Sequence, residues 1–303
     1  MSNTLETASG PLVYDVVGRG EPLLLIHGWG CASLPWHPLL TRIAPQFRCI
    51  VPDLPGAGRS QPVAVPPDMF VVRDILIRLI EQEGGPVHVI GHSMGGALAL
   101  LVAAERPDLV RRLVVTAISL FRNDRERTQF NVAMAVWEVL FRLRRRWMMN
   151  VPALYHALGR QFLRRLPDDD TFTRANFIDF LELDRAAAIR TARSATDRRI
   201  NIAAGRITVP TLYIAGRYDR LMGERGVATT AAVLPNAKLV WFEHAAHLPQ
   251  VEQPDGYAVL VSAFLHAALR LPAITHLTSP SDHFLPGESD PEPLSSILQT
   301  TVG

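Results

Sequence analysis

At 303 residues the chain is long enough to bury a large core, and its composition of 48% hydrophobic and 20% charged residues excludes a fibrous or mostly disordered protein. A formal net charge of +2 is too small to indicate nucleic-acid binding, although 30 of the 31 basic residues are arginine. Chains of this length often form one domain in α/β folds, so we expect one domain that carries an insertion.

The cysteine content and the apolar stretches indicate the compartment. Two cysteines, Cys31 and Cys49, are too few for a disulfide framework and favour a reduced, cytoplasmic chain. The first ten residues are polar and lack the basic and apolar regions of a secretory signal. The longest apolar stretch, Val87 to Ala104, is interrupted by polar residues and indicates a buried strand and helix, so we predict no transmembrane segment.

Strand patterns open the chain. Residues 12–17 predict a short strand, and the apolar run at 22–26 is typical of a central strand covered on both faces. This run ends in His27-Gly28-Trp29-Gly30, where the glycines let the backbone fold back. The Trp29 N–H is therefore a candidate donor to an oxyanion. The alternative is a strand-to-helix loop without a catalytic part, and His27 is expected to be structural.

The next segment predicts a helix at 38–44 and a strand at 47–51, followed by a loop that contains Asp53. A turn-forming role is favoured for Asp53 over acid catalysis. Asp68 is a candidate cap for a helix that reaches about Glu83, because apolar residues recur there at helical spacing and two glycines follow.

The most informative motif is Gly91-His92-Ser93-Met94-Gly95-Gly96, between an apolar strand pattern at 87–90 and an alanine-rich helix pattern at 97–104. Glycines two residues before and after a serine fit a turn too sharp for side chains at those positions. Such a strand-turn-helix unit predicts Ser93 as a nucleophile. It also puts the N–H of Met94 at a helix N-terminus, where developing negative charge is stabilised.

Residues 113–115 predict another strand, and the alternation of strands and helices indicates a mostly parallel sheet. From 119 to 200 the strand signal disappears, which predicts a helical insertion. This segment has 16 arginines against 10 acidic residues, with a cluster at 142–149 that includes Trp147. We favour an exposed charged face whose apolar side packs on the core. The alternatives are contact with an anionic membrane surface and steering of an anionic substrate.

An apolar strand pattern resumes at 207–215 and brings Asp219 just beyond its C-terminal end, where active-site residues of open α/β sheets gather. Asp219 is therefore the predicted acid that orients a catalytic histidine. Asp197 and Glu243 are weaker candidates, because neither follows a strand in this way.

Residues 238–242 are the last predicted strand, and the loop beyond them contains two candidate bases, His244 and His247. A closing helix is predicted for 254–271. The tail at 272–303 has five prolines, four acidic residues and no lysine or arginine, so we expect it to be mostly disordered or loosely packed.

Three motifs taken together, H-G-W-G at 27–30, D-L-P-G-x-G-x-S at 53–60 and G-H-S-M-G-G at 91–96, resemble the α/β-hydrolase family, in its branch of single-domain esterases, lipases and carbon–carbon bond hydrolases. The resemblance runs from about Leu12 to Leu271. It implies a mostly parallel central sheet flanked by helices, with a helical lid that covers the substrate pocket.

The resemblance also chooses between the two histidines. The family pattern G-H-x-x-x-x-E-x-P aligns on His247, with Glu252 and Pro254 in register, and leaves His244 as a loop residue. Ala246 stands where the family usually has glycine, and its methyl group is expected to alter only the loop conformation. The expected division is core at 1–118, lid at 119–200, core at 201–271 and tail at 272–303.

These assignments predict a serine hydrolase that cleaves a carboxylic ester of a small molecule through an acyl-serine. Catalysis would use Ser93, Asp219 and His247, with an oxyanion hole formed by the N–H groups of Trp29 and Met94. No metal or organic cofactor is predicted. Carbon–carbon bond hydrolysis, lactone opening and acyl transfer are alternatives with the same triad, and a non-catalytic binding protein is a further one. An arginine aimed at Ser93 would favour a carboxylate-bearing substrate, and an apolar tunnel would favour acyl chains.

Overall fold

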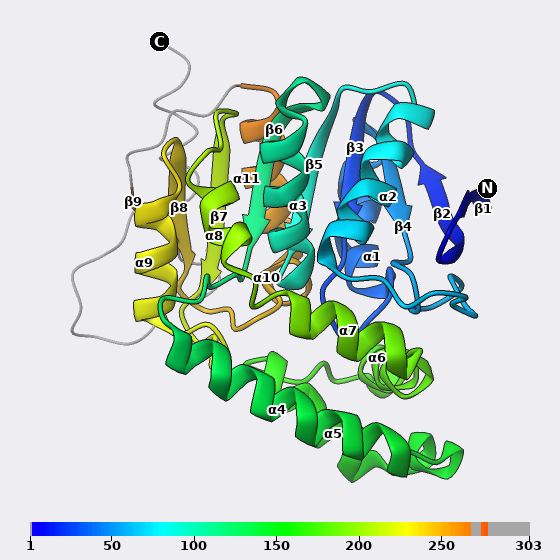
Figure 1. Cartoon of the computed structure of the whole chain (residues 1–303). Coiled ribbons are helices and arrows are strands. Elements are labelled where there is room, and N and C mark those ends of the chain that lie inside the picture. Colours follow the sequence, from blue (N-terminus) through cyan, green and yellow to red (C-terminus); the bar gives the residue numbers. More distant parts are fainter. Residues whose placement is uncertain (1, 268–273, 278–303) are drawn as a thin grey trace, which may run out of the picture.

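One twisted sheet of nine strands runs through the part of the chain that the computed structural model describes, residues 2–267 and 274–277 (Figure 1). The strand order is β1-β2-β4-β3-β5-β6-β7-β8-β9; β1 and β2 pair antiparallel with each other, β2 pairs antiparallel with β4, and the later neighbours are parallel. The strands are β1 (Ser2–Thr7), β2 (Gly10–Val17), β3 (Glu21–Ile26), β4 (Phe47–Pro52), β5 (Val87–His92), β6 (Val110–Thr116), β7 (Thr211–Gly216), β8 (Ala237–Phe242) and β9 (Ile274–Leu277).

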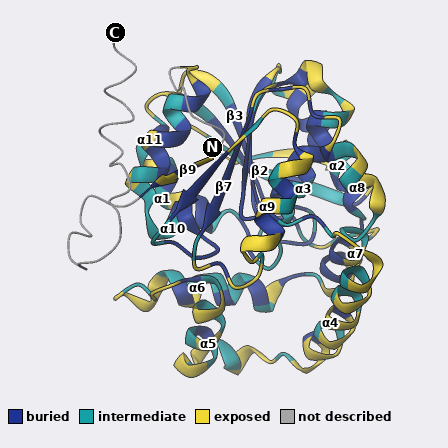
Figure 2. Ribbon diagram, turned by 90° about the vertical axis from the view of Figure 1, so that its left-hand side faces the viewer, coloured by how far each residue is buried: buried dark blue, intermediate teal, exposed yellow. Residues whose placement is uncertain are grey.

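Helices cover both faces of this sheet (Figure 2). One face carries α2 (Met69–Gln82), α3 (Met94–Glu105), α8 (Arg198–Ala204) and α9 (Glu224–Val233), and the other carries α1 (His37–Ile43), α10 (Pro249–Glu252) and α11 (Pro254–Leu265). Short 3₁₀ turns lie at η1 (Leu34–Trp36), η2 (Pro107–Leu109) and η3 (Arg146–Asn150).

The apolar run of β3 explains why the sheet is buried on both sides. Leu24 and Ile26 pack into the core cluster under α2 and α3, whereas Leu23 and Leu25 pack into the cluster under α1 and α11. Successive side chains of a strand point to opposite faces, so an uninterrupted apolar run supplies both cores. The prediction of a central strand at 22–26 is therefore confirmed.

The predicted cap of the second helix is also confirmed. The carboxylate of Asp68 accepts hydrogen bonds from the N–H groups of Phe70 and Val71, at 2.9 and 3.0 Å, and α2 ends at Gln82. These bonds satisfy two of the N–H groups that every helix start leaves without a partner inside the helix.

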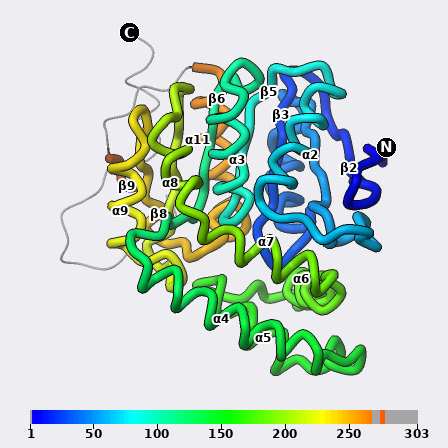
Figure 3. Tube along the Cα trace, viewed as in Figure 1, coloured from blue at the N-terminus to red at the C-terminus, as the bar shows by residue number. Residues whose placement is uncertain are grey.

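Four helices, α4 (Asp124–Leu143), α5 (Pro152–Phe162), α6 (Asp170–Glu182) and α7 (Arg185–Ser194), lie beyond the carboxyl ends of the parallel strands (Figure 3). They pack on one another through a third core cluster that includes Phe141, Phe177 and Phe180. The next helix, α8, begins inside the predicted insertion but packs its Ile200 and Ala204 into the core of the sheet with α3. The helical segment thus passes into the core before it reaches β7.

Two strands were missed by the sequence analysis. Ser2–Thr7 is largely polar and forms the edge strand β1. Ile274–Leu277 forms β9 beside β8, so 238–242 is not the last strand and this part of the tail is not loosely packed. Only four residues long, β9 has too little alternation to be recognised, although Leu277 is buried. The rest of the predicted tail, and the last residues of the predicted closing helix, lie outside the described residues.

Within the described ranges, no helix is both long enough and apolar enough to cross a bilayer.

Candidate active site

Ser93 occupies a strained turn between β5 and α3. Its backbone angles, φ of 53° and ψ of −119°, lie in a region that residues other than glycine rarely adopt. The flanking glycines are required by close backbone contacts: a Cβ at Gly91 would lie 2.3 Å from the carbonyl oxygen of Gly95, and one at Gly95 would lie 2.2 Å from that of Ile26. This is the sharp strand-to-helix turn expected from the sequence, and it raises Ser93 at the carboxyl edge of the sheet.

The loop after β3 runs beside this turn and is fixed by His27. The Nδ1 of His27 is 2.9 Å from the carbonyl oxygen of Gly28, and its Nε2 accepts the N–H of Leu54 at 2.9 Å. Because the carbonyl only accepts, Nδ1 carries the proton and the ring is neutral, in keeping with burial, which lowers the pKa of His27. Both ring nitrogens are engaged in the loop, which fits the structural role expected for this histidine.

Asp53 organises the neighbouring loop. Its carboxylate accepts the N–H of Ser33 at 3.1 Å and both the main-chain N–H and Nε of Arg59, at 3.1 and 2.7 Å. Burial alone would raise the pKa of Asp53, but the bonds and the positive charge of Arg59 outweigh it and lower the pKa. These contacts agree with the expected turn-forming role.

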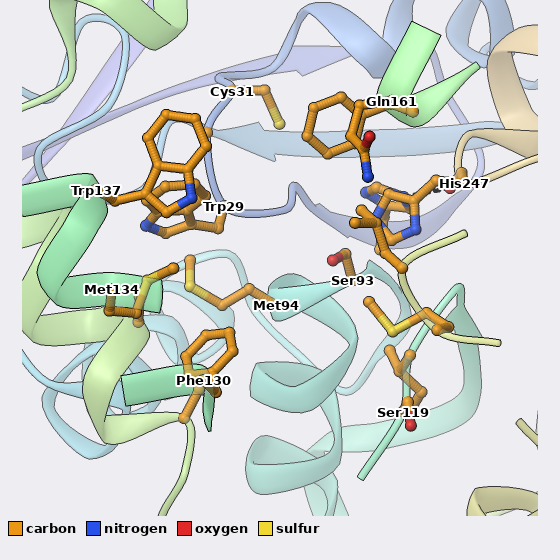
Figure 4. Close-up of a pocket in the computed structure, with 18 of the residues that line it drawn as sticks. Trp29, Cys31, Ser93, Met94, Ser119, Phe130, Met134, Trp137, Gln161 and His247 are labelled. Atoms are coloured by element: carbon orange, nitrogen blue, oxygen red, sulfur yellow. Dashed lines mark hydrogen bonds between the residues drawn. The ribbon is translucent and has the colours of Figure 1, made fainter. Parts of the chain in front are cut away.

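The two predicted oxyanion donors converge beside Ser93. Trp29 and Met94 line the same cavity as the serine, as Figure 4 shows. Among residues 2–267 and 274–277, neither the main-chain N–H of Trp29 nor that of Met94 has a hydrogen-bond acceptor. The indole N–H of Trp29 instead donates to the carbonyl oxygen of Ala188 at 2.9 Å, which holds the side chain aside. Two N–H groups are thus available to an oxygen atom of a bound molecule.

Asp219 and His247 form a buried pair at the cavity wall. Asp219 follows β7 and His247 lies in the loop after β8; their Oδ2 and Nδ1 atoms are 2.8 Å apart and both side chains are buried. The other carboxylate oxygen of Asp219 accepts the N–H groups of Leu221 and Met222, at 2.8 and 3.1 Å. Burial alone would raise the pKa of Asp219. His247 and these two N–H groups outweigh that effect, so the pKa is lowered and the carboxyl stays ionised.

Asp219 bonds to Nδ1 of His247 and so does not occupy the other ring nitrogen, Nε2. Both His247 and Ser93 line the cavity, and Figure 4 shows the two side chains on the same side of it. Three residues from separate parts of the sequence are therefore gathered at the carboxyl edge of the sheet, in the order serine, aspartate, histidine.

The weaker candidates lie elsewhere. Asp197 caps α8 and pairs with Arg199 at 2.7 Å, and Glu243 pairs with Arg217 at 2.9 Å. His244 is not among the residues that line the cavity. The methyl group of Ala246 causes no backbone strain, since Ala246 is not among the described residues with positive φ.

Sequence reasoning missed His92. Its Nε2 lies 2.8 Å from the main-chain oxygen of His247, and the two rings meet edge to face with centroids 4.8 Å apart. Burial, with a contribution from the charge of His247, lowers the pKa of His92 to about 3, so the ring is neutral and Nε2 donates. His92 thus supports the His247 loop from below. Its place directly before Ser93 was the only signal in the sequence.

The cavity has a volume of about 1230 Å³ and lies between the sheet edge and helices α4, α5 and α6. Its charged residues include Arg144, whose Nη1 is buried with no hydrogen-bond partner among the described residues. The guanidinium lies over the ring of Phe141, 4.8 Å from its centroid, and burial lowers its pKa. Most other lining residues are apolar, among them Trp29, Met94, Phe130, Met134, Trp137, Phe141, Phe162 and Phe180.

No group of three or more His, Cys, Asp or Glu residues in the described ranges is arranged to hold a metal ion.

The comparison with known protein families matches residues 21–254 to the α/β hydrolase fold. The chain belongs to the α/β-hydrolase family. This confirms the resemblance seen in the sequence motifs and covers the strands and loops that carry Ser93, Asp219 and His247.

Among relatives of this α/β-hydrolase, the pimeloyl-[acyl-carrier protein] methyl ester esterase of Yersinia pseudotuberculosis serotype IB is 28% identical over 270 residues, which cover 84% of this chain and 96% of the relative. The protein of the same name from Stenotrophomonas maltophilia is 29% identical over 264 residues, with the same coverage. The solved esterase from Exiguobacterium antarcticum superposes with a TM-score of 0.76 at 18% identity, over 88% of this chain and all of that one. This last likeness is one of fold.

Proposed function

We propose that this α/β-hydrolase cleaves carboxylic esters of small molecules through an acyl intermediate on Ser93, with His247 as base and Asp219 as its orienting acid. The observation that carries the proposal is the bond of 2.8 Å between Nδ1 of His247 and Asp219, because His247 lines the same cavity as Ser93. Relatives that are named esterases, and that align with this chain over nearly their whole length, support the same reaction class.

In the first half-reaction, Nε2 of His247 takes the proton of the Ser93 hydroxyl while the oxygen attacks the acyl carbon. The N–H groups of Trp29 and Met94 stabilise the negative charge on the carbonyl oxygen. Asp219 stabilises the imidazolium, which then gives its proton to the departing alcohol oxygen as the ester C–O bond breaks. The alcohol leaves and the acyl group remains on Ser93.

In the second half-reaction, water loses a proton to Nε2 of His247 and attacks the acyl carbon. The bond to the serine oxygen breaks, that oxygen regains the proton, and a carboxylic acid is released. The steps balance without a cofactor. The strained backbone at Ser93 holds the oxygen in place throughout, so little reorganisation is needed between the two halves.

We further propose that helices α4 to α7, within the segment 119–200, act as the lid and set the choice of substrate. Their aromatic residues supply much of the cavity wall, which favours an extended apolar acyl or alkyl chain. Arg144 on the same wall favours substrates with an acid group at the far end. The two buried free thiols, Cys31 and Cys49, support a cytoplasmic location.

The test is hydrolysis of p-nitrophenyl esters from acetate to palmitate by the wild type and by Ser93→Ala, His247→Ala and the control His244→Ala. We expect both site variants to lose activity by about 10⁴-fold or more, and the control to retain it. A fluorophosphonate should label Ser93 in the wild type, as read by mass spectrometry. Full activity of Ser93→Ala would refute the mechanism. Labelling without turnover of any ester would favour a lactone or carbon–carbon bond substrate.

The distal acid is tested with monomethyl pimelate and methyl heptanoate, which differ in a terminal carboxylate. We expect Arg144→Leu to raise KM for the first and to leave KM for the second nearly unchanged. Equal effects on both esters would remove Arg144 from the proposal and leave the triad intact.

A further inference from the structure

Helix α4 is apolar on two opposite sides. Its inner side packs on the rest of the protein: Met134 and Phe141 are buried, and the ring of Trp137 lies 5.4 Å from that of Phe180. Its outer side carries apolar residues that are spaced to form one stripe along the helix. We name this stripe, together with Trp147 just beyond the helix, the α4 outer face. The face consists of Val132, Val136, Val139, Leu140, Leu143 and Trp147.

In the part of the chain that the structure describes, the α4 outer face is uncovered. Its six side chains are between 44% and 62% exposed, and Figure 2 shows the outer turns of α4 largely in the colour of exposed residues. A surface helix of a globular protein normally turns charged and polar residues to solvent, whereas a helix that is apolar all round is buried. The sequence analysis expected the apolar side to pack on the core. Within the cluster at 142–149, that holds for Met148, which packs against the third core cluster, and is wrong for Leu143 and Trp147, which are exposed.

Arginines lie at the end of this face. Arg142, Arg145 and Arg146 are exposed. Arg142 approaches Glu138 at 3.5 Å, while Nη1 of Arg145 donates to the main-chain carbonyl oxygens of Arg142 and Arg144. Within the described ranges, Arg145 and Arg146 pair with no carboxylate. An apolar stripe thus ends in positive charge that no carboxylate among residues 2–267 and 274–277 neutralises.

The face also borders the candidate active site. Leu140 and Leu143 belong to the α4 outer face and at the same time line the cavity that contains Ser93. A molecule that leaves an apolar phase at this face would therefore meet the cavity wall directly.

We propose that the α4 outer face docks on an anionic membrane surface. The aliphatic stripe would enter the boundary between headgroups and acyl chains, the arginines would contact anionic headgroups, and Trp147 would lie at the headgroup level that its amphipathic ring favours. This inference concerns where the protein binds and does not depend on the proposed ester hydrolysis.

Two other occupants fit the observations less well. A second copy of the chain would have to bring carboxylates to Arg145 and Arg146, and the acid beside this face, Glu138, already pairs with Arg142 and Arg193. An acidic protein would satisfy the arginines but has no need of five aliphatic side chains and a tryptophan. An anionic bilayer satisfies the charge and the apolar stripe together.

The test is co-sedimentation of the full chain, as Ser93→Ala, with 100 nm vesicles of phosphatidylcholine and phosphatidylglycerol in equal parts, against vesicles of phosphatidylcholine alone. We expect binding to the mixed vesicles that weakens in high salt. The double variants Val132→Glu with Val136→Glu, and Arg145→Glu with Arg146→Glu, should each weaken it about tenfold or more.

Matched controls are Val65→Glu, whose side chain has the same 56% exposure as Val136, and Arg19→Glu, in the turn before β3 at the other end of the sheet. Both should bind as the parent does. When the same variants are made with Ser93 intact, their rates of p-nitrophenyl butyrate hydrolysis should be within about twofold of the wild-type rate, which checks the fold. Loss of binding in the controls as well would overturn the assignment to this face.

Three further results would overturn the proposal. The first is no binding to either vesicle, and the second is equal binding to both. The third combines two observations: vesicles bind neither the parent nor the variants, and the parent instead forms a dimer in light scattering or binds purified acyl carrier protein. The same double variants would abolish that dimer or that binding.

Discussion

The main-chain N–H of His247 donates a hydrogen bond to the main-chain carbonyl oxygen of Phe162, 2.9 Å away. Phe162 ends α5, so the helical segment beyond the sheet holds the loop that carries the predicted base. Its ring also lies 5.8 Å from the imidazole of His247. The position of this segment and the position of His247 are therefore coupled through a direct contact.

Glu252 strengthens this coupling. Its two carboxylate oxygens accept the N–H of Arg164 and the N–H of Ala246, each at 2.6 Å, and so join the segment after α5 to the residue before His247. Burial raises the pKa of Glu252, against the effect of these N–H groups. A partly buried carboxylate with two main-chain donors is a strong clamp on both segments.

Glu252→Gln should lower kcat for p-nitrophenyl butyrate about 10- to 100-fold, because an amide accepts only one of the two N–H groups and turns its own NH₂ toward the other. KM should change less than kcat, since the cavity wall stays in place. Steady-state kinetics with Glu105→Gln, an exposed residue outside the cavity lining, as the control would check this. Unchanged kcat would mean that Glu252 has no positioning role.

Asp219→Asn should lower kcat about 10⁴-fold. Asparagine can present its NH₂ group to Nδ1 of His247, which favours the tautomer with the proton on Nε2 and blocks the base. Asp197→Asn is the matched control, because it makes the same chemical change at a helix cap, where asparagine works as well as aspartate. Comparable losses in both variants would show that the chemical change itself, and not the contact with His247, is responsible.

Gly95→Ala should destabilise the fold by about 3 kcal/mol, since the new methyl group would lie 2.2 Å from the carbonyl oxygen of Ile26 and the backbone has no room to yield. Gly205→Ala should be neutral or stabilising, because its nearest neighbours are 3.7 Å away and its φ is −68°. The free energy of unfolding in urea measures both. Equal values for the two variants would contradict the packing argument.

The sequence predicted those parts of the site that depend on local pattern. The turn around Ser93 needs glycine at 91 and 95, and Asp219 follows an apolar strand, so both could be recognised from residue type and order. The expected role of Asp68 as a cap was recognisable for the same reason. Each of these features is decided within a few residues along the chain.

Contacts between distant main-chain groups left no such signal. The bond from His247 to Phe162 uses only N–H and carbonyl groups, which every residue pair could supply. The strand β9 forms because Ile274–Leu277 reaches β8, which a four-residue pattern does not reveal. The stripe on α4 was visible as apolar residues, but which side of a two-sided helix is covered depends on its neighbours in space.

Trp137→Ala should shift the preferred p-nitrophenyl ester to longer acyl chains. Trp137 lines the cavity, where its ring packs 6.0 Å from Trp29 and 5.4 Å from Phe180, so truncation lengthens the space available to the substrate. Trp147→Ala makes the same change on an exposed side chain and should leave the chain-length profile of soluble esters unchanged. An identical profile for Trp137→Ala and the wild type would contradict the assignment of this wall to the acyl chain.

Asp179→Asn should stabilise the protein at pH 7.5 by about 1 kcal/mol, allowing for partial exposure, and should have little effect near pH 4. Burial, and then the charges of Asp53 and Glu182, raise the pKa of Asp179 to about 6. A folded-state pKa above the unfolded value means that the folded protein binds the proton more tightly, so the contribution of Asp179 to wild-type stability rises as pH falls from about 7 toward 4. Urea unfolding across this range measures the effect, with the exposed Asp168→Asn as control. An equal gain in stability at pH 7.5 and near pH 4 would show that the charge of Asp179 is not its cause.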